Sequence, residues 1–159
     1  MRGRLLCGGL TLVALVAVAS CSDDVGPVVG ERFAAILSGT AERPTPVTTA
    51  ATGTAEFEIL DGVPGIFFKL SVANIDNVTA AHIHGPATTE QAVGVLSGLY
   101  AGAATGTGTT GVLAQGVISS ASGITFDSLV ALLRAGNAYV NVHTTANGGG
   151  EIRGQIAKQ

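Results

Sequence analysis

The chain has 159 residues, which is enough for one compact domain with short terminal segments. Eight Lys and Arg against eleven Asp and Glu give a net charge of −3, which argues against nucleic-acid binding because that function needs a basic surface. Tryptophan is absent and aromatic residues are few, which argues against a stacking platform for sugars or bases.

The first twenty residues have the pattern of an export signal. Two arginines precede an uncharged apolar run, residues 5–19, which is too short to span a membrane comfortably. The run ends in the letters VASC, which resemble a bacterial lipobox, the motif whose cysteine is lipidated and becomes the first mature residue. The sequence therefore predicts a signal peptide over 1–20 and a lipid on Cys21. The alternative is an ordinary export signal that contains a cysteine.

This pattern predicts an exported protein that its lipid holds in the cell envelope, at the outer membrane if the host has one. Residues 21–31 are expected to form the anchor and a flexible linker, and residues 32–159 the folded domain. Cys7 would leave with the signal and Cys21 would carry lipid, so we expect no disulfide in the domain. The net charge of the mature chain would be about −5.

Alternation of apolar and polar residues dominates the rest of the chain. In TGTAEFEIL, the residues Ala55, Phe57 and Ile59 share one face, and GIFFKLSVA alternates in the same way, as is typical of half-buried strands. The turn sequence DGVPG between these two runs predicts a hairpin. Further strands are expected at 33–37, 78–84, 93–99, 112–119, 138–144 and 151–156. About eight short strands predict an all-β fold, an antiparallel sandwich or small barrel.

One short helix interrupts this pattern. In TFDSLVALLRAGN, apolar residues recur at helical spacing, with Thr125 as the N-cap and Gly136 as the C-terminal cap. The Gly- and Thr-rich stretch 101–111 is expected to form a mobile hairpin loop between two strands. Its glycine spacing matches a dinucleotide-binding fingerprint only superficially, because that site needs a strand before it and a helix opening at it.

The three histidines raise the main functional question. His82 and His84 share one face of an expected strand, opposite Ile83, and His143 lies on the non-core face of a later strand. Imidazoles in this arrangement can reach one metal ion, and three neutral imidazoles suit copper or zinc. The alternative is that they are polar residues of a solvated face that hydrogen-bond nearby loops. The choice depends on whether the two strands are neighbours.

Three charged residues, Glu42, Glu151 and Arg153, also fall outside the expected core. We expect them to form a structural polar network, in which Glu42 pairs with Arg153 and links the first strand to the last. The alternative is a surface ion network, which contributes little stability. The chain has neither a Gly-x-Ser-x-Gly motif nor a cysteine nucleophile in the domain, which argues against hydrolysis by those routes.

Three motifs in the chain resemble the CHRD domain, which was first defined in chordin and also occurs singly in bacterial secreted proteins. They are ILSGTAERPTPVTTAATGTAEFEI, VTAAHIHGPA and LRAGNAYVNVHTTANGGGEIRGQI, and the resemblance runs from about Phe33 to Ala157. The resemblance implies an all-β domain in an extracytoplasmic setting. In chordin these domains belong to a protein that sequesters growth factors, a role that we do not transfer. The three histidines, Glu151 and Arg153 all lie within the motifs.

A histidine pair of the form His-x-His on a β-sandwich strand, with a later strand histidine, is also similar to the copper half of copper–zinc superoxide dismutases. The fourth histidine, the bridging imidazole, the zinc loop and the disulfide of those enzymes are missing here. This similarity therefore implies a lone copper site rather than a dismutase.

Three functions remain as expectations. The first is an envelope-anchored, non-enzymatic binding module with a copper or zinc site at His82, His84 and His143. The second is a structural or protein-interaction domain whose partner is another envelope protein. The third is a copper-dependent redox enzyme.

Overall fold

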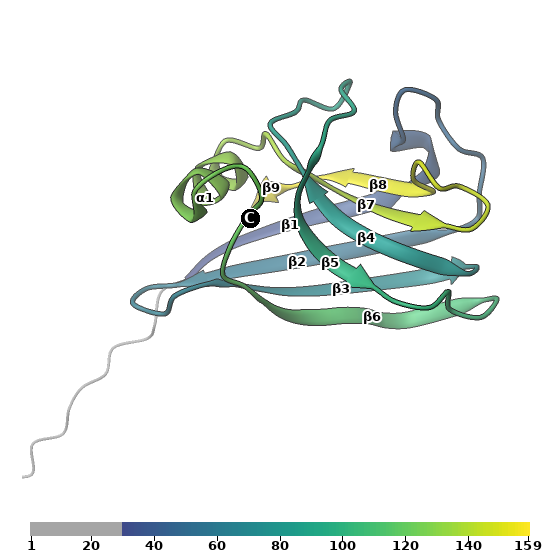
Figure 1. Ribbon diagram of the computed structural model, residues 1–159, viewed down its shortest axis with the longest axis horizontal. Coiled ribbons are helices and arrows are strands. Elements are labelled where there is room, and N and C mark those ends of the chain that lie inside the picture. Colours follow the sequence, from purple (N-terminus) through teal and green to yellow (C-terminus); the bar gives the residue numbers. More distant parts are fainter. Residues whose placement is uncertain (1–29) are drawn as a thin grey trace, which may run out of the picture.

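The computed structural model describes residues 30–159, so the expected signal peptide and the lipid anchor at Cys21 lie outside the described residues. The elements are nine strands, one α-helix and a 3-10 turn (Figure 1). In chain order they are β1 (Gly30–Ser38), η1 (Gly39–Ala41), β2 (Thr52–Leu60), β3 (Ile66–Ile75), β4 (Val78–His84), β5 (Val95–Ala101), β6 (Thr109–Ile118), α1 (Phe126–Arg134), β7 (Tyr139–Thr144), β8 (Ile152–Gln155) and β9 (Ala157–Lys158). Within residues 30–159 there is no helix with the length and apolar character needed to cross a membrane.

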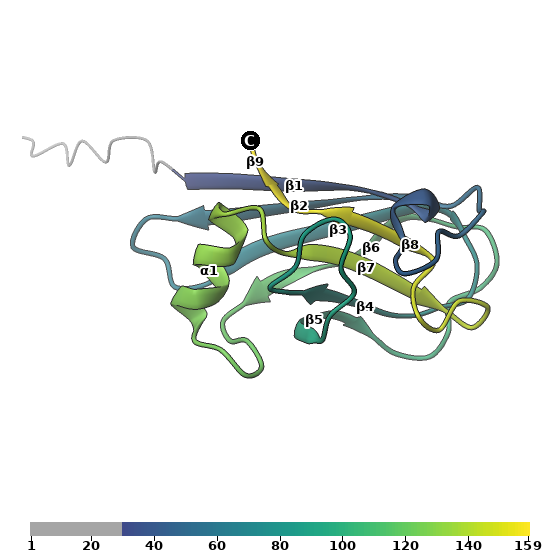
Figure 2. The same ribbon diagram turned by 90° about the horizontal axis from the view of Figure 1, so that it is seen from above.

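The strands form one strongly curved antiparallel sheet. Their order is β5-β4-β7-β8-β1-β2-β3-β6, and β9 pairs with β1 beside this path. The sheet curls into a nearly closed barrel (Figures 1 and 2). The expected all-β antiparallel fold with one short helix is therefore confirmed. β9 was not expected from the sequence, because two residues are too short to show a strand pattern.

The alternating residues point into the barrel as predicted. In the hairpin of β2 and β3, Ala55 pairs with Leu70 and Phe57 with Phe68, and the first three of these side chains are buried. Each fully buried Leu, Ile or Phe side chain stabilises a fold by about 1.5–3 kcal/mol. Since the domain is expected to have no disulfide, this core is the main source of its stability.

The helix α1 lies at one end of the barrel, near the start of β1 (Figures 1 and 2). It begins as predicted, because the Thr125 hydroxyl accepts a hydrogen bond from the Ser128 backbone N–H at 3.1 Å. It ends before Gly136, which has a φ of +68°, a backbone conformation that favours glycine. Leu129 and Leu133 are fully buried and anchor the helix to the barrel core.

The strand β1 includes Gly30 and Glu31, two residues that were expected to belong to the linker. Gly30 and Glu31 continue β1 by pairing with Leu60 and Ile59 of β2. The Glu31 carboxylate also accepts hydrogen bonds from Arg134, at the end of α1, and from Lys158 in β9. These long-range contacts draw residues assigned to the linker into the sheet.

The expected hairpin at residues 101–111 is wrong. β5 and β6 are the two ends of the sheet order and do not pair with each other. The segment between them is tied to the start of β4 instead: the Thr105 backbone N–H donates to the Val78 carbonyl, and the Thr105 hydroxyl accepts from the Val78 N–H. Local composition cannot reveal such contacts, because they join residues far apart in sequence.

Candidate metal centre

The strands that carry the histidines are direct neighbours. β4 pairs antiparallel with β7, so that Ala80 lies opposite His143, and His82 opposite Asn141. All three histidine side chains leave the sheet on its outer face, because Ile83, Val140 and Val142 point into the core. The condition that sequence analysis left open, adjacency of the two strands, is met.

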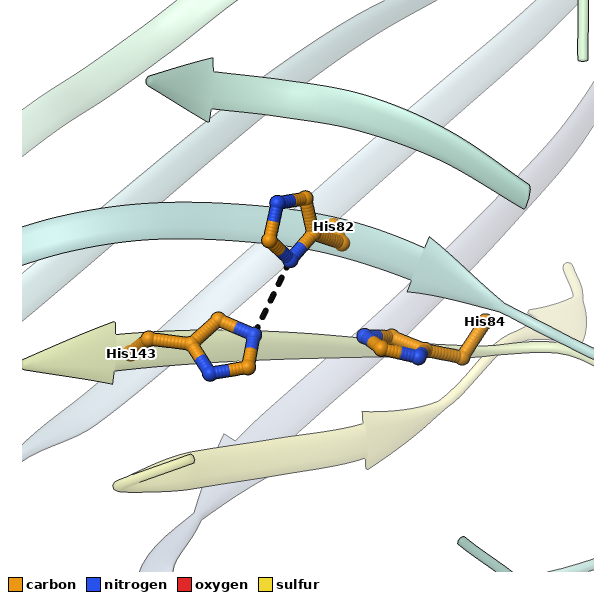
Figure 3. Close-up of side chains that lie close together, drawn as sticks. All are labelled: His82, His84 and His143. Carbon is orange, nitrogen blue, oxygen red and sulfur yellow. Dashed lines mark hydrogen bonds between the residues drawn. The ribbon is translucent and has the colours of Figure 1, made fainter. Parts of the chain in front are cut away.

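The imidazoles converge on one point (Figure 3). The Nδ1 atom of His82 lies 3.0 Å from the Nε2 atom of His143. One nitrogen from each of His82, His84 and His143 lies within 4.8 Å of the other two. Two nitrogens bound to one tetrahedral ion at about 2.0–2.1 Å are about 3.4 Å apart. A contraction of up to about 1.4 Å between the nitrogens would therefore let one ion bind all three.

Backbone carbonyls fix the tautomers of two of the rings. The Nδ1 atom of His143 lies 3.0 Å from the Gly148 carbonyl oxygen, and Nδ1 of His84 lies 2.9 Å from the Val93 carbonyl oxygen. A carbonyl only accepts, so each Nδ1 carries the proton and donates it. The Nε2 atoms of both rings are thereby left with free lone pairs, the form in which imidazole binds metals.

The contact with Val93 also explains why β5 begins at Val95 rather than at Val93 as expected. The Val93 carbonyl accepts from His84, and its backbone N–H donates to the Tyr139 hydroxyl at 3.2 Å. Both polar backbone groups of Val93 therefore form hydrogen bonds with side chains of the site.

The ring of His82 completes the set. Because Nε2 of His143 can only accept, Nδ1 of His82 donates the hydrogen bond between them. A metal ion would take the place of this proton, which would move to Nε2 of the same ring. The candidate ligand atoms are therefore Nδ1 of His82 and Nε2 of His84 and His143.

Burial keeps the cluster neutral. It lowers the pKa of His82 to about 4, with smaller contributions from the charges of His143 and His84. Burial also lowers the pKa of His84 and of His143. The Nε2 atom of His84 is buried and has no hydrogen-bond partner. Such an atom is costly unless something binds it, and a metal ion would do so.

Tyr139 holds His84 in place. The two rings are stacked, with centroids 4.9 Å apart and an interplanar angle of 3°. The guanidinium carbon of Arg153 lies 3.5 Å from the Tyr139 ring centroid, from the strand on the other side of β7. This stack spans β4, β7 and β8 and restricts the orientation of the His84 ring.

Glu42 lies in a buried network beside the histidines, with only 3% of its surface exposed. Its two carboxylate oxygens accept from the Asn141 side-chain amide at 3.0 and 3.1 Å. Burial raises the pKa of Glu42 to about 7, although the Asn141 hydrogen bonds oppose this shift. Glu42 and Arg153 do not form the expected direct ion pair, because the Asn141 amide binds the carboxylate and Arg153 donates to the Thr88 carbonyl.

Glu151 is also buried and organises the turn after β7. Its carboxylate accepts hydrogen bonds from Thr49 at 2.8 Å, Thr144 at 2.7 Å and Asn147 at 3.1 Å. The same turn contains Gly148, whose carbonyl orients His143. Glu151 therefore supports a metal-ligand candidate through the backbone. The alternative of a solvated surface ion network for Glu42, Glu151 and Arg153 is wrong, because all three are buried.

Tyr139 and Asn141 lie on the same face of β7 as His143, and sequence analysis gave neither of them a role. Strand parity alone shows the face, while their roles depend on register with β4 and β8. A surface pocket lies elsewhere, over β1, β2 and β3, and contains none of these side chains. Its ion-paired charged rim offers no cluster of ligand atoms.

Comparison with known protein families matches residues 33–156 to the CHRD domain. The chain belongs to the CHRD domain family. All three histidines of this CHRD domain, together with Glu42, Glu151 and Arg153, fall within the matched residues. Searches of curated proteins and of solved structures found no match. The family match therefore identifies the module, and the candidate site is defined by the geometry of its own residues.

Proposed function

We propose that this CHRD domain is a non-enzymatic binding module that holds one copper or zinc ion. The ligands are Nδ1 of His82, Nε2 of His84 and Nε2 of His143. The observation that carries the proposal is the convergence of three neutral imidazoles within 4.8 Å on the outer face of β4 and β7. Neutral nitrogen donors suit both metals.

Two features of the surroundings support metal binding. Carbonyl groups hold two of the three rings in the tautomer that a metal needs, which is how second-shell groups orient metal-bound histidines. The buried, unpartnered Nε2 of His84 costs stability in the metal-free protein. Metal binding would remove that cost, so part of the affinity comes from relieving it.

We also propose that the mature protein is exported and anchored to the envelope membrane by a lipid on Cys21. In that arrangement the anchor precedes Gly30, at the end of the barrel where α1 lies (Figure 1). Ser38, at the other end of β1, pairs with Arg153 of β8, and Arg153 lies opposite Asn141. At the α1 end, His84 pairs with Tyr139, which follows the helix by five residues. The metal centre would therefore lie on the outer face of the sheet, between the two ends of the barrel.

A structural role for the histidines is the competing function. The ring nitrogens already hydrogen-bond the Val93 and Gly148 carbonyls and each other, and these bonds alone brace two loops. A bracing role predicts no stoichiometric metal affinity, whereas a metal centre predicts a 1:1 complex.

Calorimetric titration of the purified protein with Cu²⁺ and with Zn²⁺ distinguishes the two functions. We expect one ion per chain, and loss of that binding in each of His82→Ala, His84→Ala and His143→Ala. Thr54→Ala is a matched control, because Thr54 is an exposed strand residue outside the cluster. Unchanged binding in the histidine variants would reject the proposed centre, and absence of binding by the unaltered protein would favour the bracing role.

A further inference from the structure

We propose that the metal at this centre keeps one coordination position open and binds a small anion from solution there. This inference rests on the proposed metal site and adds the class of ligand that the site takes. In this arrangement three histidines bind the ion, and no fourth side chain is needed as a ligand.

The described residues supply only three ligands. Within residues 30–159, the group of His, Cys, Asp and Glu side chains able to share one ion consists of His82, His84 and His143 alone. Zinc and copper commonly take a fourth ligand, and sites with three protein ligands leave that position to water or another small molecule. The fourth ligand must therefore come from outside this cluster.

The buried carboxylates next to the site are engaged elsewhere. Both oxygens of Glu42 accept hydrogen bonds from Asn141, at 3.0 and 3.1 Å. The oxygens of Glu151 accept from Thr49, Thr144 and Asn147. Turning Glu42 toward the ion would take the carboxylate away from the buried Asn141 amide, and turning Glu151 would take it away from Thr49, Thr144 and Asn147. Both movements are unfavourable, because a polar group inside the protein that loses its hydrogen-bond partner destabilises the fold.

The outer side of the cluster is open to solvent. His84 is the inner ligand, only 7% exposed and covered by Tyr139, whereas His82 and His143 are half-buried. The turn beside His143 contains the exposed pair Gly148 and Gly149, which carry no side chain that could cover the ion. Solvent access and the unfilled coordination position therefore lie on the same side.

The charge of the site favours an anion. Three neutral imidazoles leave the charge of a divalent ion uncompensated, and a bound cation is then the largest local charge. A second positive charge lies nearby, because the Arg153 guanidinium stacks on the Tyr139 ring, which in turn stacks on His84. A small anion such as azide would neutralise part of this charge and complete the coordination.

Azide titration of the Cu²⁺-loaded protein tests the proposal. We expect a new azide-to-copper charge-transfer absorption and a changed electron paramagnetic resonance spectrum, saturating at one azide per copper. Equilibrium dialysis should show that the copper stays bound throughout. The control Thr54→Ala should give the same azide affinity within about twofold, because it leaves the coordination unchanged.

Three outcomes would overturn the inference, and they are distinguishable. Stoichiometric copper binding with no spectral response to azide means that the position is closed, and only this inference fails. A response that appears only in Glu42→Gln or Glu151→Gln means that a carboxylate fills the position. Absence of copper binding removes both this inference and the proposed function.

Discussion

The Nδ1 atom of His82 donates a hydrogen bond to the Nε2 atom of His143 at 3.0 Å, although the two residues are 61 positions apart in the chain. The bond exists because β4 and β7 are paired, and it places two candidate ligand atoms at nearly the separation that one bound ion requires. It also means that metal binding requires a change of tautomer at His82 rather than a rearrangement of the sheet.

The metal affinity should begin to fall at a lower pH than it would if the three histidines had ordinary pKa values. The pKa of His82 is lowered to about 4, and burial also lowers the pKa of His84 and His143. All three rings are therefore already neutral at pH 7, and no proton has to be released. We expect the zinc affinity to stay constant between pH 8 and pH 6 and to fall only below that. A tenfold or greater fall between pH 7 and pH 6, measured by calorimetry, would show ordinary imidazole pKa values and contradict this expectation.

The stability of the metal-free protein should decrease as the pH falls from about 6.5 toward 4. In this range the unfolded chain binds protons on its histidines, whereas the folded state, with lowered pKa values, does not. Glu42 acts in the opposite direction, because its pKa is raised to about 7 and its ionisation destabilises the fold as the pH rises from 4.5 to 7. The lowering of the His82 pKa is similar in size to the raising of the Glu42 pKa, so the additional lowering at His84 and His143 makes the effect of the histidines the larger one.

Glu42→Gln should therefore make the loss of stability in acid steeper. We expect the difference in unfolding free energy between pH 8 and pH 5 to grow by about 1–3 kcal/mol in this variant. Urea denaturation at the two pH values, without metal, measures the difference. An unchanged or smaller difference would mean that Glu42 titrates in the fold as it does in the unfolded chain.

Much of the fold follows from local patterns. Alternation identified the strands, and the caps at Thr125 and Gly136 identified the helix, because these signals depend on a few neighbouring residues. The segment between β5 and β6 was mistaken for a hairpin because its hydrogen bonds go to Val78 and not to its own flanking strands. Pairing between distant strands is a property of the whole chain.

The candidate site, too, was predictable from local patterns only in part. Strand parity placed His82, His84 and His143 on the non-core faces of their strands. Only the pairing of β4 with β7 brings the three side chains together. Parity also suggested that Arg153 points to solvent, whereas it is 1% exposed beneath the segment that contains Thr88. A face that points away from the barrel core can still be buried by loops, and no local pattern reports that.

Glu151→Ala should weaken metal binding without removing a ligand. The turn that presents the Gly148 carbonyl to His143 would lose its hydrogen bonds to the Glu151 carboxylate. We expect a fall in affinity of about 10–100-fold, the usual cost of losing a second-shell contact. Nitrogen NMR shifts of His143 should show a mixture of tautomers in this variant and one tautomer in the unaltered protein.

Glu151→Gln is the matched variant for this experiment. Its amide keeps the shape and one acceptor oxygen, so it should recover part of the affinity and the single tautomer of His143. Glu151→Ala could instead lower the free energy of unfolding while leaving the tautomer of His143 and the metal affinity unchanged. In that case Glu151 supports only the fold and not the site.

The anchor prediction can be tested separately from the metal centre. Expression in a bacterial host with labelled palmitate should give a labelled protein in the membrane fraction, because Cys21 would be acylated. Cys21→Ser should lose the label, and Cys7→Ser should keep it, since Cys7 lies within the predicted signal peptide. Label retained in Cys21→Ser would rule out the lipobox interpretation.

X-ray absorption spectroscopy of the zinc- or copper-loaded protein tests the metal centre most directly, because it reports the type and distance of the ligands. We predict three imidazole nitrogens at about 2.0–2.1 Å and one further light atom in the first coordination shell. His84→Ala should remove the inner ligand and with it the three-imidazole signature. A spectrum with one imidazole or with oxygen ligands alone would contradict a shared site at His82, His84 and His143.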